Sequence, residues 1–294
     1  IDADGNLIAW DAARAGADIY PDYFRGLLPA LYPWMGDGFV EGVANLSEWY
    51  FEKFVTDVAS TEGLFEDYDH PNTRVTHMTV DHELPMTFWR AVGHSYTAFA
   101  KESMIDELAQ AAGMDEVAFR LQNTRNTPRL NNVIRVAGER MESMTPPSGH
   151  HLGFAAHSAF HTDVAEIAEV SVENGKIRVH KVTCVLDCGQ AVNPDIVRSQ
   201  MEGGVIYGLT AALYGGLNLE NGAIKESNFH DYPMLRMGQT PPVDVHILEG
   251  SDTPGGAGEP GTPPAAPALV NAVFAATGKR FRTLPVIGRE LTLV

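Results

Sequence analysis

The chain has 294 residues, of which 44% are hydrophobic and 20% charged, with 28 Gly and 18 Pro. These values are typical of globular proteins with one large domain or two ordinary ones, and they exclude a mainly disordered or collagen-like chain. The formal net charge is −17 and no basic run is present, so the chain lacks the cationic surface that a nucleic-acid partner requires.

The first residues carry no recognisable targeting signal. The chain starts at Ile1 without a basic segment followed by an apolar one, so the compartment, cytoplasmic or periplasmic, is unknown. The longest apolar stretches, such as 265–276, are well short of the ~20 residues that cross a bilayer. Residues 7–10 follow the turn signal Asp4-Gly5 and predict half of a β-hairpin. A chain that opens on a strand suggests a piece of a larger protein.

Helical patterns dominate the rest of the first half. The N-terminal part is irregular and rich in aromatic residues, with one short predicted helix at 46–58. Apolar residues at three- and four-residue spacing predict a helix over 95–112, which Gly113 ends. Two more helices are predicted at 115–122 and 130–141.

A Pro- and Gly-rich linker follows these helices. The segment 145–149 reads Thr-Pro-Pro-Ser-Gly, which is typical of a connection between structural units. We therefore expect two subdomains, 1–147 and 148–294.

Beyond the linker the apolar period changes to that of strands. Predicted strands at 165–172 and 177–186 flank Asn174-Gly175, the strongest short-range signal for a hairpin. Cys184 and Cys188 lie four residues apart in the second strand and its exit, so their side chains are roughly 13 Å apart. This separation argues against a disulfide between them.

The C-terminal part alternates irregularly between helix and strand. A helix from Asn193-Pro194 to about Leu213 and a short hairpin around Asn221-Gly222 precede a strand at 243–248. A last helix is predicted at 264–277.

The ends of this last helix carry their own signals. Thr262 is the predicted N-cap, Pro263 occupies the tolerated first position, and Gly278 follows the C-terminus. The mixture of elements along the chain predicts an α+β fold.

The segment 254–264 is the sharpest chemical feature. Its glycines allow the backbone to approach a ligand closely, and amides that lead into a helix form a site for anions. Glu259 precedes Pro260, which restricts its backbone and aims its side chain. A solvated charge at the start of a helix is the alternative interpretation.

Two further segments combine polar groups with small or aromatic residues. The segment 88–95 places Trp89 and Arg90 just before a helix, where they fit an anion or an aromatic substrate, or simply a packed Trp beside an ion-paired Arg. Gln200 precedes Gly203 and Gly204 by one turn of helix, which admits a bulky group or serves close helix packing.

The histidines suggest a metal site only weakly. Zinc sites prefer fixed short spacings, whereas the four candidates lie on the linker and the strand after it, where loop or packing roles are the alternative. These candidates are His150, His151, His157 and His161. A metal-independent hydrolase using His161 and Asp163 is a further alternative, but no nucleophile motif is present.

Five segments, taken in order, resemble the molybdopterin-binding large subunit of the xanthine dehydrogenase/aldehyde oxidase family. The resemblance is to its C-terminal half, and it is strongest to the branch with isoquinoline 1-oxidoreductase β subunits and bacterial aldehyde dehydrogenases. It covers nearly everything after about residue 70. The segments are 88–94, 102–108, 187–204, 228–232 and 258–280.

The resemblance implies roles for particular residues. Glu259 is expected to be the general base beside molybdenum, in an oxidative hydroxylation of aldehydes or N-heteroaromatics with water as the oxygen source. No protein ligand to the metal is expected, because molybdenum is held by the dithiolene of the molybdopterin. The expected cofactor-binding residues are Phe88, Trp89, Arg90, Ala91, Val92, Gln200, Gly256, Ala257 and Gly258.

The resemblance also gives the two expected subdomains an identity. Residues 1–147, with the Phe-Trp-Arg loop, would be part of a first molybdopterin-binding subdomain. Residues 148–294, with the Gly-Glu-Pro loop, would be part of a second one.

Partners are a further implication of the resemblance. The cofactor is expected in its cytosine dinucleotide form. The family's other glycine-rich cofactor loops are missing, so another chain or an N-terminal half must carry them. The [2Fe–2S] clusters are expected on an iron–sulfur subunit, with a cytochrome as a further electron acceptor.

One departure from the family pattern concerns the loop over the metal. Arg90 is followed by Ala91 where the wider family has glycine, which narrows the space there and leaves the substrate size open. A non-catalytic half that completes a partner's molybdopterin site is the alternative function, although the intact Glu259 argues against it.

Overall fold

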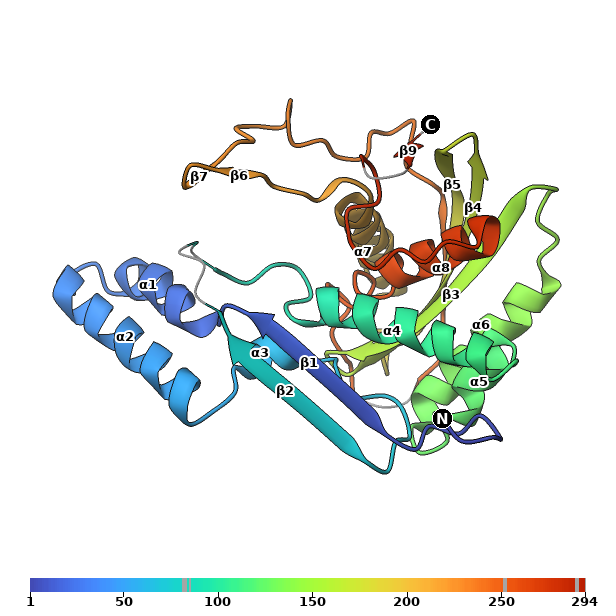
Figure 1. The fold of residues 1–294 in the computed structure, drawn as a ribbon, viewed down its shortest axis with the longest axis horizontal. Coiled ribbons are helices and arrows are strands. Elements are labelled where there is room, and N and C mark those ends of the chain that lie inside the picture. Colours follow the sequence, from blue (N-terminus) through green and yellow to red (C-terminus); the bar gives the residue numbers. More distant parts are fainter. Residues whose placement is uncertain (81–83, 85, 251–252, 289–290, 294) are drawn as a thin grey trace.

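The centre of the molecule is a mixed five-stranded sheet. The computed structural model describes residues 1–80, 84, 86–250, 253–288 and 291–293. Strands β3, β4, β5 and β8 lie side by side in that order, and β9 also pairs with β5 (Figure 1). The first three pair antiparallel, whereas β8 and β9 run parallel to β5. The bounds are β3 His150–Ala159, β4 Thr162–Glu173, β5 Lys176–Asp187, β8 Val243–Ile247 and β9 Thr292–Leu293.

The predicted hairpin around Asn174-Gly175 is confirmed. It joins β4 to β5, and both turn residues have positive φ, 51° and 73°. Two successive left-handed residues match the right-handed twist of the flanking strands, which is why Asn-Gly is favoured there.

Helices cover both faces of the sheet. One face packs on α7 (Pro194–Tyr214) and α8 (Ala265–Thr277), and the other packs on α6 (Pro128–Ser143). The core divides in this way because neighbouring residues of a strand point to opposite faces. The packing of α8 is especially close: a Cβ on Gly153 would lie 2.0 Å from the amide nitrogen of Ala272.

The predicted helices of the middle region are confirmed with small shifts of their ends. They are α4 (His94–Ala111), α5 (Glu116–Gln122) and α6. Asp115 caps α5 by accepting from two amides at 2.9 Å each, and Asn193 caps α7 in the same way at 3.1 Å. None of the helices in the described ranges is long and apolar enough to cross a membrane.

The predicted N-cap of α8 is wrong. The capping position is Pro264, and the Thr262 hydroxyl donates instead to the carbonyl of Gly204 in α7 at 3.3 Å. Helix α8 starts after two consecutive prolines and has no side-chain cap. The Thr262 hydroxyl instead links the start of α8 to α7. The predicted end is confirmed, because Gly278 takes the left-handed conformation with φ of 70°.

The predicted N-terminal hairpin is also wrong. Strand β1 (Trp10–Gly16) pairs in parallel with β2 (Thr73–Thr79), with Trp10 opposite Thr73. The apolar pattern identifies a strand but carries no information about a distant partner. The connection between the two strands holds α1 (Tyr20–Leu31), α2 (Asp37–Lys53) and α3 (Val58–Thr61).

The helix predicted at 46–58 is only partly correct. Helix α2 begins earlier, at Asp37, and ends at Lys53, and residue 58 already belongs to α3. Near the other end of the chain, the predicted short hairpin is present as β6 (Leu219–Glu220) and β7 (Ala223–Ile224).

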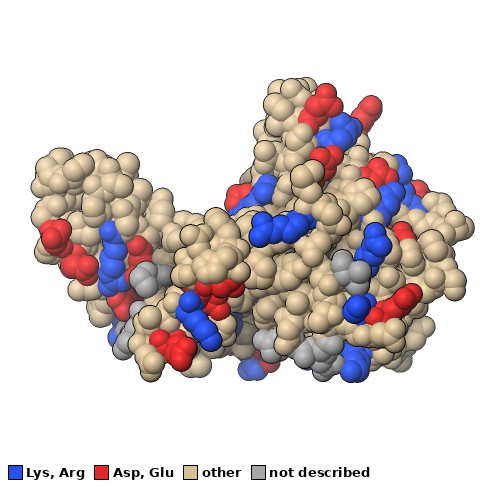
Figure 2. Space-filling view, turned by 90° about the horizontal axis from the view of Figure 1, so that it is seen from above, with Lys and Arg blue, Asp and Glu red and all other residues tan. Residues whose placement is uncertain are grey.

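Helices α1 and α2 form a lobe that stands apart from the sheet (Figure 1). In Figure 2 a notch separates this lobe from the main body, and charges of both signs are scattered over the face shown. The lobe exposes many large apolar side chains. They are Leu31, Tyr32, Trp34, Phe39, Leu46, Trp49, Tyr50 and Phe54. An exposed apolar patch of this kind is typical of an interaction surface.

A buried ion pair connects α4, α5 and β3. The side chains of Glu102 and Arg120 are both fully buried, with Arg120 Nε 2.9 Å from Glu102 Oε2. The same carboxylate accepts from the Tyr68 hydroxyl at 2.6 Å and from the Ala156 amide at 2.9 Å. Arg120 also donates to the Phe154 carbonyl at 3.4 Å. Both oxygens of the carboxylate therefore have partners, as a buried charge requires.

Replacing Glu102 by Ala is expected to lower the free energy of unfolding by about 3–5 kcal/mol, because it leaves the Arg120 charge buried and unpaired. Chemical denaturation of the variant and of the parent protein measures this difference.

The matched control is Glu107→Ala, which removes a carboxylate paired with the exposed Arg282. Exposed pairs are worth less than about 1 kcal/mol. Equal destabilisation by the two variants would contradict the role of the buried pair.

Candidate functional site

The glycine-rich loop lies against the tight turn between β3 and β4. The Gly256 amide donates to the Phe160 carbonyl at 2.8 Å, and the Thr162 hydroxyl donates to the Gly256 carbonyl at 2.7 Å. A Cβ on Gly255 would lie 2.3 Å from the carbonyl oxygen of His161. Glycine is therefore needed at position 255 to let the two segments approach.

Arg90 joins three segments that the sequence analysis singled out. Its Nε donates to the Gly258 carbonyl at 2.9 Å, and its Nη2 donates to the backbone and side-chain oxygens of Gln200 at 3.3 Å each. The guanidinium carbon also lies 5.6 Å from the centre of the Tyr207 ring, on which Trp89 stacks at 4.6 Å. One cation thus brings together residues from three separate parts of the chain.

Glu259 is held by the loop that carries Arg90. Its Oε1 accepts from the Ala91 amide at 3.0 Å, and the residue is partly buried. Ala91 and Val92 both have positive φ, 70° and 48°. Positive φ is uncommon outside glycine, and for a β-branched residue it is strained. The glutamate therefore accepts a hydrogen bond from a backbone that is itself in an unfavourable conformation.

Glu62 is a neighbour of the site that the sequence analysis missed. Its Oε1 accepts from the Gly93 amide at 3.2 Å. Burial raises the pKa of Glu62 to about 7, and the negative charges of Glu66, Asp57 and Glu259 contribute to this rise. Glu62 lies in the irregular N-terminal part, where no motif distinguishes it.

Two buried histidines extend from Glu62 into the protein. His94 Nε2 lies 3.7 Å from Glu62 Oε2, and His94 Nδ1 lies 2.8 Å from His157 Nε2. His157 Nδ1 is 3.4 Å from Asp67 Oδ2, which also pairs with Lys101. Burial lowers the pKa of His94 to about 4 and holds the pKa of His157 well below its usual range, so both rings are neutral near pH 7.

The other candidate histidines lie elsewhere. His150 pairs with Glu169 at 2.6 Å and stacks on His180 at 3.8 Å. His151 is on β3, and His161 is in the turn to β4 with φ of 61°. Within the described part of the chain, no group of three or more His, Cys, Asp or Glu side chains is placed to hold a metal ion.

The geometry around Asp163 does not favour the hydrolase interpretation. Its carboxylate accepts from Arg129 Nε and from the Ser158 hydroxyl, each at 2.5 Å. These hydrogen bonds go to residues other than His161. Both thiols, Cys184 and Cys188, are free and buried.

The remaining predicted residues differ in their surroundings. Phe88 packs edge-on against Tyr23 of α1 at 4.7 Å, and Gln200 is exposed on α7. In the described ranges the amides of Ala257 and Gly258 have no partner within the protein. The site therefore presents a guanidinium, a side-chain amide and backbone amides, which are hydrogen-bond donors suited to a pterin and to anionic groups.

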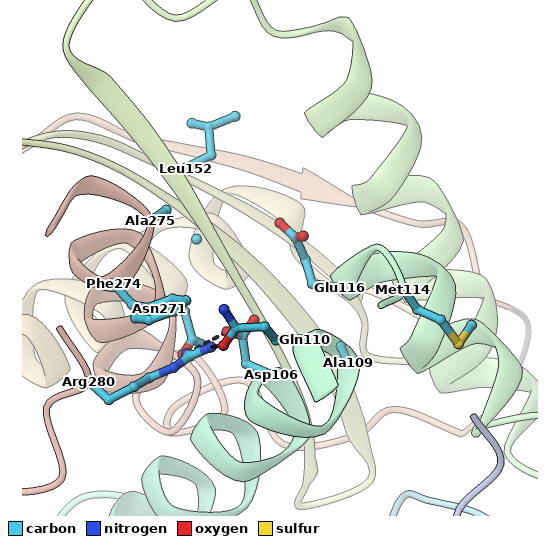
Figure 3. A pocket seen from close by; sticks show the side chains of 11 residues that line it. Asp106, Ala109, Gln110, Met114, Glu116, Leu152, Asn271, Phe274, Ala275 and Arg280 are labelled. Carbon is cyan, nitrogen blue, oxygen red and sulfur yellow. Dashed lines mark hydrogen bonds and ion pairs between the residues drawn. The ribbon is translucent and has the colours of Figure 1, made fainter. Parts of the chain in front are cut away.

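A separate cavity of about 220 Å³ lies between α4, α5, β3 and α8 (Figure 3). Arg280 binds Asp106 at 2.5 Å and Asn271 at 3.2 Å there, and Glu116 also lines the cavity. The lining includes none of the predicted site residues, so this cavity is distinct from the Arg90 cluster.

Two family models match the chain. Residues 86–241, more than half of the chain, match a molybdopterin cofactor-binding domain, and residues 43–124 match a second model of the same description. The first match contains both Arg90 and Gln200.

Curated relatives are similar over most of this chain. The beta subunit of isoquinoline 1-oxidoreductase from Brevundimonas diminuta is 34% identical over 83% of this chain and 32% of its own length. A nicotinate dehydrogenase subunit from Pseudomonas putida is 33% identical over 76% of this chain and 20% of its own length. The chain thus spans about a third of the first relative and a fifth of the second.

The fold is also similar to a solved structure, the aldehyde oxidoreductase of Desulfovibrio gigas. The TM-score is 0.67 at 14% identity, and the match covers 97% of this chain and 47% of that one. This likeness shows the fold, and the family models with the curated relatives show that the chain belongs to the molybdopterin-binding subunits of the xanthine dehydrogenase family.

Proposed function

We propose that this chain supplies the catalytic half of a molybdenum hydroxylase active site. The reaction is the oxidative hydroxylation of aldehydes or N-heteroaromatics, with water as the oxygen source and Glu259 as the general base. The observation that carries the proposal is the position of Glu259. Its side chain accepts from the Ala91 amide, and the carbonyl of the preceding residue, Gly258, accepts from Arg90.

The donor cluster fits a molybdopterin. Arg90, Gln200 and the backbone of 256–258 would hold the cofactor, and Trp89, Ala91 and Val92 would flank it. Phe88 would support this loop from the side of α1. The bound cofactor supplies the two-electron redox chemistry, whereas the protein supplies binding, orientation and electrostatics.

The geometry of Glu259 suits a base. Oε1 is occupied by the Ala91 amide, and Oε2 has no protein partner among the described residues. The bond to Ala91 and the Pro260 that follows limit the motion of the side chain, so Oε2 keeps one direction. A fixed carboxylate with one free oxygen can accept a proton from a group in front of it.

The exposed lobe supports a role for other chains. We propose that the remaining cofactor loops come from another chain or from an N-terminal half. An iron–sulfur subunit with [2Fe–2S] clusters, and then a cytochrome, would accept the electrons. The curated relatives are named as subunits, which agrees with this arrangement. The cytosine dinucleotide form of the cofactor belongs to the same proposal.

The alternative is a non-catalytic half that only completes a partner's site. A purely structural half has no need for a carboxylate with one unpaired oxygen beside an arginine cluster, so the geometry of Glu259 favours catalysis.

Glu259→Gln in the full-length protein is expected to reduce turnover by ~10²-fold or more, because the amide cannot accept the proton. Molybdenum content should stay unchanged, since Gln can still accept from the Ala91 amide. Steady-state rates and metal analysis measure both. The matched control, Glu220→Gln in the exposed β6, should leave turnover unchanged. A Glu259→Gln variant with over half of the parental activity would refute the assignment.

The 294-residue chain produced alone is expected to purify without molybdenum and to self-associate, because the cofactor site is incomplete and the α1–α2 lobe is uncovered. Metal analysis and size-exclusion chromatography test this expectation. A monodisperse monomer with one molybdenum per chain would overturn it.

The walls near the site favour apolar substrates. A cavity of about 380 Å³ borders Trp89 and is also lined by Tyr96 and Phe99, with Arg282 as its charged residue. No Lys or Asp occurs between Thr87 and Tyr96, so beyond Arg90 that segment offers little to a charged group. A segment with so few charged groups leaves several carbonyl and N–H groups of a purine unpaired on its side of the site.

Benzaldehyde, acetaldehyde or isoquinoline is therefore expected to give a higher kcat/KM than xanthine. A steady-state panel of these four compounds tests the expectation, and it fails if xanthine has the highest value.

A further inference from the structure

We propose that Glu62 is a second carboxyl group of the active site, a positioning residue that carries a proton beside the ionised Glu259 and sets the basicity of that base. The inference rests on the proposed function, because it gives Glu62 a part in the same proton-accepting step. No motif of the sequence includes Glu62, and its place follows from its contacts alone.

The two carboxyl groups share one short piece of backbone. Glu259 Oε1 accepts from the Ala91 amide at 3.0 Å, and Glu62 Oε1 accepts from the Gly93 amide at 3.2 Å. Between these amides lies Val92, whose φ is positive. The strained loop 91–93 is therefore held by two carboxyl groups, that of Glu62, which precedes it in the chain, and that of Glu259, which follows it.

Two buried histidines form the side of the site next to Glu62. His94 Nδ1 and His157 Nε2 are hydrogen-bonded at 2.8 Å. His157 Nδ1 lies 3.4 Å from Asp67 Oδ2 but makes no hydrogen bond within the described part of the chain.

His94 Nε2 lies 3.7 Å from Glu62 Oε2. Because burial lowers the pKa of His94 to about 4, this ring is neutral near pH 7 and offers no positive charge to an ionised Glu62. The neutral ring therefore does not compensate the charge of a half-buried carboxylate.

The surrounding charges act in the same direction. The negative charges of Asp57, Glu66 and Glu259 act on Glu62, and the neutral His94 at the start of α4 lies 3.7 Å from it. The ammonium of Lys101 on α4 is occupied by Asp67 and by the Glu66 carbonyl. Burial, with these carboxylates, raises the pKa of Glu62 to about 7.

The protonation state of Glu62 changes the properties of Glu259. When the pH rises through about 7, Glu62 releases its proton to solvent. The new negative charge attracts the proton that Glu259 is proposed to accept, which helps the transfer. Turnover should therefore rise by about two- to fivefold across this transition.

Glu62→Gln is the decisive variant. Its amide oxygen can accept from the Gly93 amide and its side chain carries no charge, so it mimics protonated Glu62. In the full-length holoenzyme we expect the parental rate near pH 6, an unchanged molybdenum content, and no rise in turnover through pH 7. A profile that still rises as in the parent, or a loss of activity at every pH with the cofactor bound, would overturn the proposal.

A second measurement does not depend on turnover. Infrared difference spectra of the full-length protein between about pH 6 and pH 8 should show one carboxyl losing its proton in the parent and in Glu220→Gln, but not in Glu62→Gln. The same signal in all three proteins would also overturn the proposal. If the parent protein has no hydroxylase activity, the proposed function fails, and the infrared titration still decides whether Glu62 carries the proton.

Discussion

The contact between Glu102 and Arg120 fixes the helix from which the site is built. Glu102 lies on α4, and its carboxylate is bound by Arg120 of α5 and by the Ala156 amide of β3. Helix α4 begins at His94, directly after the loop with Arg90 and Ala91. Its position on the sheet places the His94 ring 5.4 Å from the Phe160 ring, in the turn that supports the glycine-rich loop. Because this helix is held, the Ala91 amide meets Glu259 across 168 positions of sequence.

Conformational strain and polar contacts balance each other at the site. Left-handed backbone outside glycine costs of order 1–3 kcal/mol per residue. Ala91 and Val92 both have this left-handed conformation. The amides of Ala91 and Gly93 donate to carboxyl groups. A hydrogen bond to an ionised acceptor such as Glu259 is stronger than a neutral one and offsets part of this strain. The loop conformation and the direction of Glu259 therefore depend on each other.

The elements with local signals could be predicted from the sequence, and those that depend on distant contacts could not. The helix at 94–111 and the hairpin at Asn174-Gly175 follow from side-chain periodicity and turn chemistry, which are properties of neighbouring residues. The parallel pairing of β1 with β2 depends on a partner beyond three helices, which no local pattern identifies.

The same distinction applies to the site. Arg90, Gln200 and Glu259 stand in recognisable motifs, and the structure brings Arg90 to Gln200 and the Arg90 loop to Glu259. Glu62 stands in no motif, and the pairing of His94 with His157 was not predicted although both residues lie in segments with a signal, since these contacts arise only when the N-terminal segment packs on α4 and β3. Thr262 shows the converse: its place before a helix suggested a cap, but its hydroxyl binds a carbonyl of α7 instead.

The segment before Arg90 connects the outer lobe directly to the Arg90 cluster. Asp22 of α1 accepts from the Met86 amide at 2.6 Å, and Phe88 packs on two tyrosines of the same helix. Two residues further along, Arg90 binds Gly258 and Gln200. The contacts with α1 and the contacts with Gly258 and Gln200 are thus made by neighbouring residues of one short segment, so neither set can move far without the other. Ordering the lobe and ordering the Arg90 loop are therefore coupled, because immobilising either one reduces the conformational freedom left to the other.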